Sequence, residues 1–146
     1  MRTVAFLLCA LALSGCMPTK QPPAAEVVPV PADRLFPIDF SNGHTGTVTI
    51  TRDVGFVGSG CYLGVLVNGQ MAAHLDPGER VTLELTATRH ILTATWIKGR
   101  GLCGVMSEKS MAARRRSTEI LLGIGAIQHY RIYTTTEEYP VIEPAL

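Results

Sequence analysis

Short stretches in which apolar and polar side chains alternate make up most of the chain after residue 44. Residues 47–51 alternate threonine with valine and isoleucine, and residues 81–86 alternate aliphatic side chains with threonine and glutamate. A period of two places every second side chain on one face of a β-strand. Further apolar runs lie at 61–67, 71–75, 91–96, 118–122 and 127–135. The pattern predicts an all-β domain.

Turn-forming residues separate these runs. Asn68-Gly69 lies between two of them and is a strong hairpin signal, because both residues tolerate a positive φ. The segment Asp76-Pro77-Gly78-Glu79 places proline and glycine where a type II turn takes them. The glycine-rich segments 54–60 and 98–104 are expected to be loops. Residues 123–125 are expected to close a final hairpin.

About seven short strands with turns roughly every 8–12 residues favour a single antiparallel β-sandwich, or a small barrel, over residues 38–146. Residues 105–116 suit either a short helix or a twisted strand, and we expect a strand followed by an irregular segment. Residues 139–146 contain two prolines and are expected to be irregular or to form an edge. The predicted core consists of Val48, Ile50, Leu63, Val65, Leu83, Leu85, Leu92, Trp96, Leu122, Tyr130 and Ile132.

The first fifteen residues have a different character. Arg2 is followed by the apolar segment 4–13, which is shorter than the roughly 18 apolar residues that indicate a transmembrane helix. Small residues then precede Cys16. This arrangement is typical of a cleaved secretory signal, and a plain signal peptide with a chance cysteine is one interpretation of it.

The segment Leu13-Ser14-Gly15-Cys16 also resembles the lipobox of bacterial lipoproteins. The resemblance implies cleavage after residue 15 and acyl chains on Cys16, and several chains together hold a protein firmly at a membrane. Residue 17 is methionine and not aspartate, which by analogy with lipoprotein sorting implies the outer membrane. The expected lipid partner is therefore the outer membrane, bound through the acyl chains.

Residues 17–37 hold six of the nine prolines in the chain. Proline has no amide donor and fixes φ, so we expect this stretch to stay outside any sheet or helix. An extended chain rising about 3.1 Å per residue would reach roughly 60 Å. The expected organisation is a signal peptide over 1–15, a lipidated proline-rich tether over 16–37 and a β-sandwich over 38–146. A spacer and an unselected flexible leader are both compatible with this composition.

Four cysteines are present, of which Cys9 leaves with the signal and Cys16 is expected to be lipidated. The remaining pair, Cys61 and Cys103, would face an oxidising compartment, which predicts a disulfide. Such a bridge closes a loop of about 43 residues and would stabilise the fold by roughly 4 kcal/mol. A metal site is the weaker alternative, because neither cysteine has a second cysteine or a histidine at ligand spacing.

Charge and chemistry exclude several classes of function. Without the signal the chain has 12 basic and 12 acidic residues, a balance that argues against nucleic-acid binding. The four histidines are scattered, so we expect surface or turn positions for them. Ser59 lacks the G-x-S-x-G context of a hydrolase nucleophile. The basic run 114–116 is expected to be a solvated loop, with anionic lipid headgroups as the alternative contact. We predict no catalytic residue, cofactor or metal, and no enzyme.

Four segments, at 52–61, 67–70, 75–78 and 89–92, carry a resemblance to a known family. Together they are similar to a set of small proteobacterial outer-membrane lipoproteins of unknown function with a PEGA-like β-module. The resemblance spans about residues 45–104 and depends mainly on turn residues. It implies a β-sandwich and a location in the cell envelope, and it brings no catalytic residues with it.

Two functions are compatible with these observations. The first is an outer-membrane-anchored periplasmic lipoprotein that acts as a structural or protein-interaction module, with an envelope protein as its partner. The alternative is a periplasmic ligand-binding or hydrolase-inhibitor module. In that case the two glycine-rich loops, joined by the expected disulfide, would form an apolar pocket or a protrusion. The candidate binding residues on these loops are Phe56, Ser59, Lys98 and Arg100.

Overall fold

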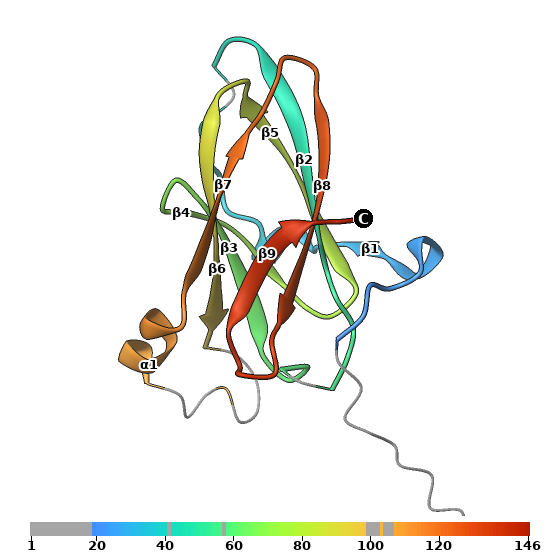
Figure 1. Ribbon diagram of the computed structural model, residues 1–146, viewed down its shortest axis with the longest axis vertical. Helices are drawn as coiled ribbons and strands as arrows, with labels where there is room; N and C mark the ends of the chain where they lie inside the picture. The colour runs from blue at the N-terminus through green and yellow to red at the C-terminus, as the bar shows by residue number, and fades with distance from the viewer. Residues whose placement is uncertain (1–18, 41, 57, 99–102, 104–106) are drawn as a thin grey trace, which may run out of the picture.

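The computed structural model describes residues 19–40, 42–56, 58–98, 103 and 107–146. Within these ranges the chain forms nine β-strands, two short 3-10 helices and one α-helix. The strands lie in two sheets that are not closed into a barrel (Figure 1). The prediction of an all-β sandwich is confirmed, with nine described strands where about seven were expected.

The first sheet is mixed and contains five strands. Their order is β1 (Val28–Pro29), β5 (Glu79–Thr86), β2 (Thr45–Arg52), β8 (Ile127–Thr134) and β9 (Pro140–Pro144). The pairs β1–β5 and β2–β8 are parallel, so the prediction of a wholly antiparallel sandwich is wrong. Residues 140–144 form the edge strand expected near the C-terminus.

The second sheet is antiparallel and contains four strands. Their order is β4 (Gln70–Leu75), β3 (Tyr62–Val67), β6 (Arg89–Ile97) and β7 (Arg116–Leu121). Because β7 and β8 belong to different sheets, the predicted final hairpin is wrong. The intervening turn is bonded to β2 instead: Gly125 N–H donates to Thr45 O at 2.9 Å, and Thr47 N–H donates to Ala126 O at 2.8 Å. These bonds lead β8 into the sheet of β2.

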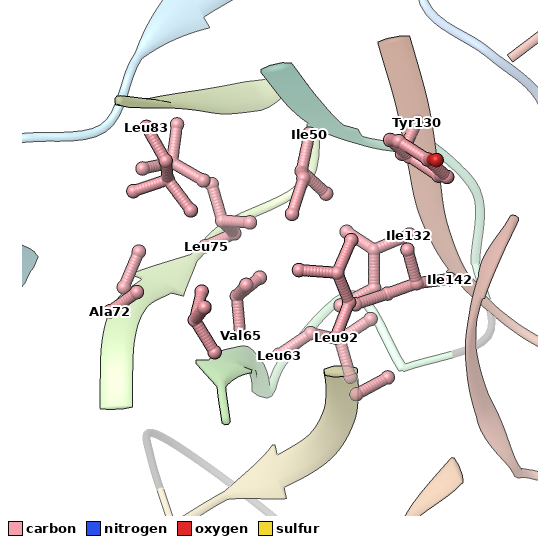
Figure 2. Close-up of a cluster of buried hydrophobic side chains, with 14 of the residues drawn as sticks. Ile50, Leu63, Val65, Ala72, Leu75, Leu83, Leu92, Tyr130, Ile132 and Ile142 are labelled. Atoms are coloured by element: carbon pink, nitrogen blue, oxygen red, sulfur yellow. The ribbon is translucent and has the colours of Figure 1, made fainter. Parts of the chain in front are cut away.

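The core lies between the two sheets, and all eleven predicted core residues are buried. Figure 2 shows aliphatic side chains from both sheets meeting around Leu63, Val65 and Ile132. The Asn68-Gly69 hairpin is also confirmed, with φ angles of 48° and 84°. Alternation along the strands and a positive-φ turn were therefore sufficient to predict the centre of the fold.

The two ends of the sandwich are distinguished below by their loops. The proximal end, at the bottom of Figure 1, is where β3 begins and where β6 ends. The distal end, at the top, carries the β7–β8 connection and the start of β2. Strand β2 runs from the distal to the proximal end and so links the two.

Residues 107–116 differ from the expectation of a strand followed by an irregular segment. Helix α1 (Glu108–Ala113) comes first, and β7 begins at Arg116. Ser107 caps the helix, because its side chain accepts a hydrogen bond from Ser110 N–H at 3.2 Å. Met111 is the buried residue of the helix and joins the core cluster. Residues 104–106 lie outside the described residues.

The proline-rich leader, residues 19–37, is bound to the sandwich. Two 3-10 helices, η1 (Ala24–Glu26) and η2 (Ala32–Arg34), flank β1, which pairs with β5. Val28 N–H donates to Gly78 O in the turn before β5 at 3.1 Å, and Val30 N–H donates to Arg80 O of β5 at 2.9 Å. Pro29 lies between them, where the ladder needs no donor. The prediction that this stretch stays outside any sheet is wrong.

A partly buried ion pair between Arg34 and Glu79 fixes the leader further along the chain. Arg34 donates to both carboxylate oxygens of Glu79, at 2.7 and 2.5 Å, and this bond raises the pKa of the guanidinium. Leu35 then bridges to Ala73 of β4. The leader thus covers the β5 edge of one sheet and the β4 edge of the other, which protects both from pairing with another chain.

Candidate functional site

A cleft of about 690 Å³ opens at the proximal end, and it is called the Trp96 cleft below. Its walls come from the loop before β3, the end of β6, helix α1 and the β8–β9 loop. The described lining residues are Phe56, Gly58, Ser59, Gly60, Cys61, Trp96, Cys103, Ser110, Arg114 and Glu138. The loop before β3 was predicted as a candidate binding loop, and it forms one wall.

Trp96 lies beneath this loop. Its side chain is buried in the core, as predicted, and its ring also lines the cleft. The indole Nε1–H donates to Glu138 O at 3.0 Å, which satisfies its polar atom. Gly58 has a φ of +72°, and a Cβ there would lie 2.5 Å from Trp96 Cη2. Only glycine therefore allows the loop to lie this close to the ring.

The disulfide between Cys61 and Cys103 is present, with a Cα–Cα distance of 5.4 Å. This confirms the predicted pairing. Both cysteines are buried and both line the Trp96 cleft. The bridge ties the residue before β3 to the segment after β6, so two walls of the cleft are covalently joined.

Arg52, at the end of β2, holds the same loop from inside. Its guanidinium donates to Cys61 O at 2.6 Å, to Leu75 O at 2.6 Å and to Gly58 O at 2.7 Å. Arg52 is only 2% exposed, and burial lowers its pKa to about 10. A buried cation bonded to three main-chain carbonyls fixes the conformation of the loop.

Asp53 anchors the start of this loop to the neighbouring strand. Its buried carboxylate forms a bidentate ion pair with Arg131 of β8. Burial raises the pKa of the Asp53 carboxyl, and the Arg131 pair opposes part of that rise. The Asp53 N–H also donates to Ile132 O at 3.0 Å. The loop therefore leaves β2 in a fixed direction.

The basic run at the mouth of the cleft lies against the protein. Arg114 pairs with Glu138 at 2.5 Å across the rim, and Arg115 Nε donates to Thr95 Oγ1 at 3.3 Å. The guanidinium of Arg116 lies 3.9 Å from the centre of the Tyr139 ring. The run is not the loop that was predicted, because Arg114 is the C-cap of α1 and Arg116 begins β7, but Arg115 and Arg116 are exposed to solvent as expected.

The predicted site residues are only partly brought together. Phe56 and Ser59 line the Trp96 cleft, whereas Lys98 is exposed beyond the end of β6 and does not belong to the lining. Arg100 and Cys16 lie outside the described residues. The sequence did not indicate Ser110, Arg114 or Glu138, which come from segments distant in the chain.

The chemistry of the cleft suits binding of an apolar group. Trp96, Phe56 and the disulfide present apolar surface, and the Arg114–Glu138 pair adds a polar edge. Ser59 Oγ donates to Phe56 O at 3.0 Å within its own turn. Across the described ranges, no three His, Cys, Asp or Glu side chains lie together in a way that could hold a metal ion.

Two histidines do not occupy the surface or turn positions expected for them. His90 is 1% exposed at the distal end, between Asn68 and Thr86. Asn68 Nδ2 lies 3.0 Å from His90 Nδ1, and His90 Nε2 lies 2.9 Å from Thr86 O. Because the amide nitrogen donates and the carbonyl oxygen accepts, these contacts place the imidazole hydrogen on Nε2. His74 is half-buried between the rings of Phe36 and Tyr62.

The distal end carries the second notable surface. Leu121, Ile124 and Ile127 are 75, 72 and 67% exposed, and they lie at the end of β7, in the β7–β8 connection and at the start of β8. This trio is called the distal aliphatics below. Near it, Arg89 and Glu119 form an exposed ion pair at 3.6 Å. The sequence pattern signalled a turn here and gave no indication that its aliphatic side chains would face solvent.

Comparison of the chain with protein-family models, with curated proteins and with solved structures gives no match. The resemblance to PEGA-like lipoproteins therefore stays a prediction. Among the helices of the described residues, none is both long enough and apolar enough to span a membrane.

Proposed function

We propose that this protein is an outer-membrane-anchored periplasmic lipoprotein whose β-sandwich acts as a structural or protein-interaction module of the cell envelope. The observation that carries the proposal is the exposure of the distal aliphatics. Three aliphatic side chains, each at least two-thirds exposed, lie within seven residues. Exposed apolar side chains that form one contiguous patch often mark an interaction site, and we propose that these three do so here.

The position of this surface also supports the proposal. At one end of β2, Thr45 accepts a hydrogen bond from Gly125 of the β7–β8 connection. Just past its other end, Val54 pairs with Lys20, close in sequence to the lipobox-like Cys16. An anchor at residue 16 would hold the proximal end near the membrane and leave the distal aliphatics open to a periplasmic partner.

The anchor is tested by mass analysis of the mature protein. We expect a chain that begins at Cys16 and carries acyl groups on its sulfur and its amine. An unmodified thiol at Cys16 would remove the proposed location. This measurement is independent of the partner and is made first.

The interaction is tested by photo-crosslinking in intact cells. A photoreactive amino acid at Ile124 should give a discrete protein adduct, and the same residue at Val28, which is 52% exposed in the leader, is the matched control. Replacing Leu121 and Ile127 with serine should abolish the adduct. If Ile124 gives no adduct, or the same products as Val28, the interaction proposal fails.

A second candidate function is ligand binding in the Trp96 cleft, and the apolar lining favours it. Trp96 is the single tryptophan of the chain, so its fluorescence reports on this cleft alone. A brominated fatty acid that occupies the cleft should quench this fluorescence with saturation. The variant Gly58→Ala, whose added Cβ would lie against the ring, should weaken the quenching. Quenching that rises linearly without saturation would contradict this function.

A further inference from the structure

We infer that the proximal end of the sandwich rests directly on the bilayer surface, with the Phe56 side chain inserted among the lipid headgroups. This inference depends on the lipid anchor of the proposed function. It replaces the expected long tether with a direct contact between the domain and the membrane.

The first step concerns the length of free chain. Lys20 N–H donates to Val54 O at 2.8 Å, and Val54 N–H donates to Lys20 O at 2.9 Å, so the leader is bound to the sandwich from Lys20 onward. Only three residues separate Lys20 from Cys16. Four Cα–Cα steps span at most about 14 Å in any conformation. The headgroup region alone is roughly 5–8 Å thick, so an acylated Cys16 keeps Lys20 within about 6–9 Å of the headgroup surface.

The second step identifies the surface that meets the lipid. Thr19 lies beside Gly55, since a Cβ on Gly55 would come within 2.9 Å of Thr19 Cα. The next residue, Phe56, is 87% exposed, whereas Phe36, the other phenylalanine among the exposed large hydrophobic residues, is only 37% exposed. An exposed aromatic ring beside a lipid attachment is the arrangement by which peripheral proteins enter the interface.

The exposed charges at the proximal end are of both signs and do not by themselves indicate binding to a membrane. Lys20, Lys98 and Lys109 are exposed there, and so are Glu108 and Glu137. Lysine side chains can extend their ammonium groups toward phosphates while their carbon chains lie along apolar surface. The short anchor and Phe56 therefore define the contact, and the lysines add to it.

Two consequences follow for the rest of the molecule. The Trp96 cleft, which Phe56 helps to line, would open toward the lipid. The distal aliphatics would point away from the membrane at a height set by the length of the sandwich.

Depth-dependent fluorescence quenching tests this orientation. The full lipidated protein is reconstituted into phosphatidylethanolamine–phosphatidylglycerol vesicles that contain lipids brominated near the headgroup. Phe56→Trp is compared with Ile124→Trp, a matched change at a distal position that is 72% exposed. The wild type, which contains only Trp96, supplies the background. We expect Phe56→Trp to be quenched several-fold more strongly than Ile124→Trp.

The outcomes separate this inference from the anchor. If both variants load onto vesicles and are quenched equally, the proximal end does not rest on the bilayer. That result overturns this inference and leaves the anchor intact. Protein with an unmodified Cys16 that does not load overturns the anchor and, with it, this inference. Strong quenching of both variants would also overturn it, because the distal end would then contact lipid.

Discussion

The two ends of the sandwich are held by different kinds of interaction. The proximal end is held by a disulfide, by the buried Arg52 guanidinium on three carbonyls, and by the partly buried Arg34–Glu79 pair of the leader. The distal end is joined mainly by main-chain hydrogen bonds between the β7–β8 connection and β2, and leaves large aliphatic side chains in solvent. Long glycine-rich loops need side chains to fix them, whereas a short connection is fixed by the strands that it joins.

The largest expected effect comes from removing the covalent link at the proximal end. Replacing both Cys61 and Cys103 with alanine frees a loop with a sequence separation of 42 residues. The free energy of unfolding should fall by about 4 kcal/mol, because the unfolded chain regains the entropy of that loop. Urea denaturation followed by Trp96 fluorescence measures the change. A reducing agent should destabilise the wild type and leave the variant unchanged; equal sensitivity would contradict this.

The second-largest loss of stability is expected when the buried guanidinium of Arg52 is removed. Arg52→Met preserves much of the side-chain volume but leaves Cys61 O, Leu75 O and Gly58 O without their donor. Buried acceptors without a partner are costly, and we expect a loss of about 3 kcal/mol in the free energy of unfolding. The matched control is Arg89→Met at the distal end, where the ion pair is largely exposed. Similar losses in the two variants would contradict the contrast between the ends.

A smaller effect should appear as a pH dependence at the leader. Burial between Phe36 and Tyr62, together with the nearby Arg34 charge, lowers the pKa of His74 below its usual value near 6.5. As the pH falls below about 6.5, the unfolded chain binds a proton at His74 while the folded chain does not. Stability is therefore complete above that pH and decreases as the pH falls through the lowered pKa of the folded state.

Urea midpoints measured between neutral and mildly acidic pH test this dependence. His74→Gln should flatten the decrease in stability on the acidic side. The control His129→Gln removes an exposed imidazole from β8 and should keep the wild-type profile. If both variants flatten the profile equally, the effect does not come from the leader.

The sequence predicted the centre of the fold better than its edges. Alternation identified the buried residues of β2, β5 and β6, because burial on one face of a strand follows from the period of two. The same signal cannot say to which sheet a strand belongs, and β7 and β8 were therefore paired incorrectly. That choice depends on bonds between residues 122–126 and β2, which no local pattern contains.

The leader and the site show a second limit of prediction from the sequence. Proline removes one donor, yet Val28 and Val30 on either side of Pro29 still bond to the sandwich. The loop residues Phe56 and Ser59 were predicted from glycine content, but the acceptors of Arg52 come from two segments distant in the chain, the loop before β3 and the end of β4. In contrast, α1 has a local signal in the sequence, because Ser107 is a favourable N-cap residue.

The smallest expected effect sharpens the contrast between the ends. Leu121, Ile124 and Ile127 are each more than 65% exposed, so replacing all three with serine removes almost no buried surface. The free energy of unfolding should change by less than about 1 kcal/mol, because exposed substitutions away from special contacts have small effects. The control is Leu122→Ser in the same connection, which is 2% exposed and should be strongly destabilising. If the triple variant were as unstable as Leu122→Ser, the distal aliphatics would belong to the fold and would not be available to a partner.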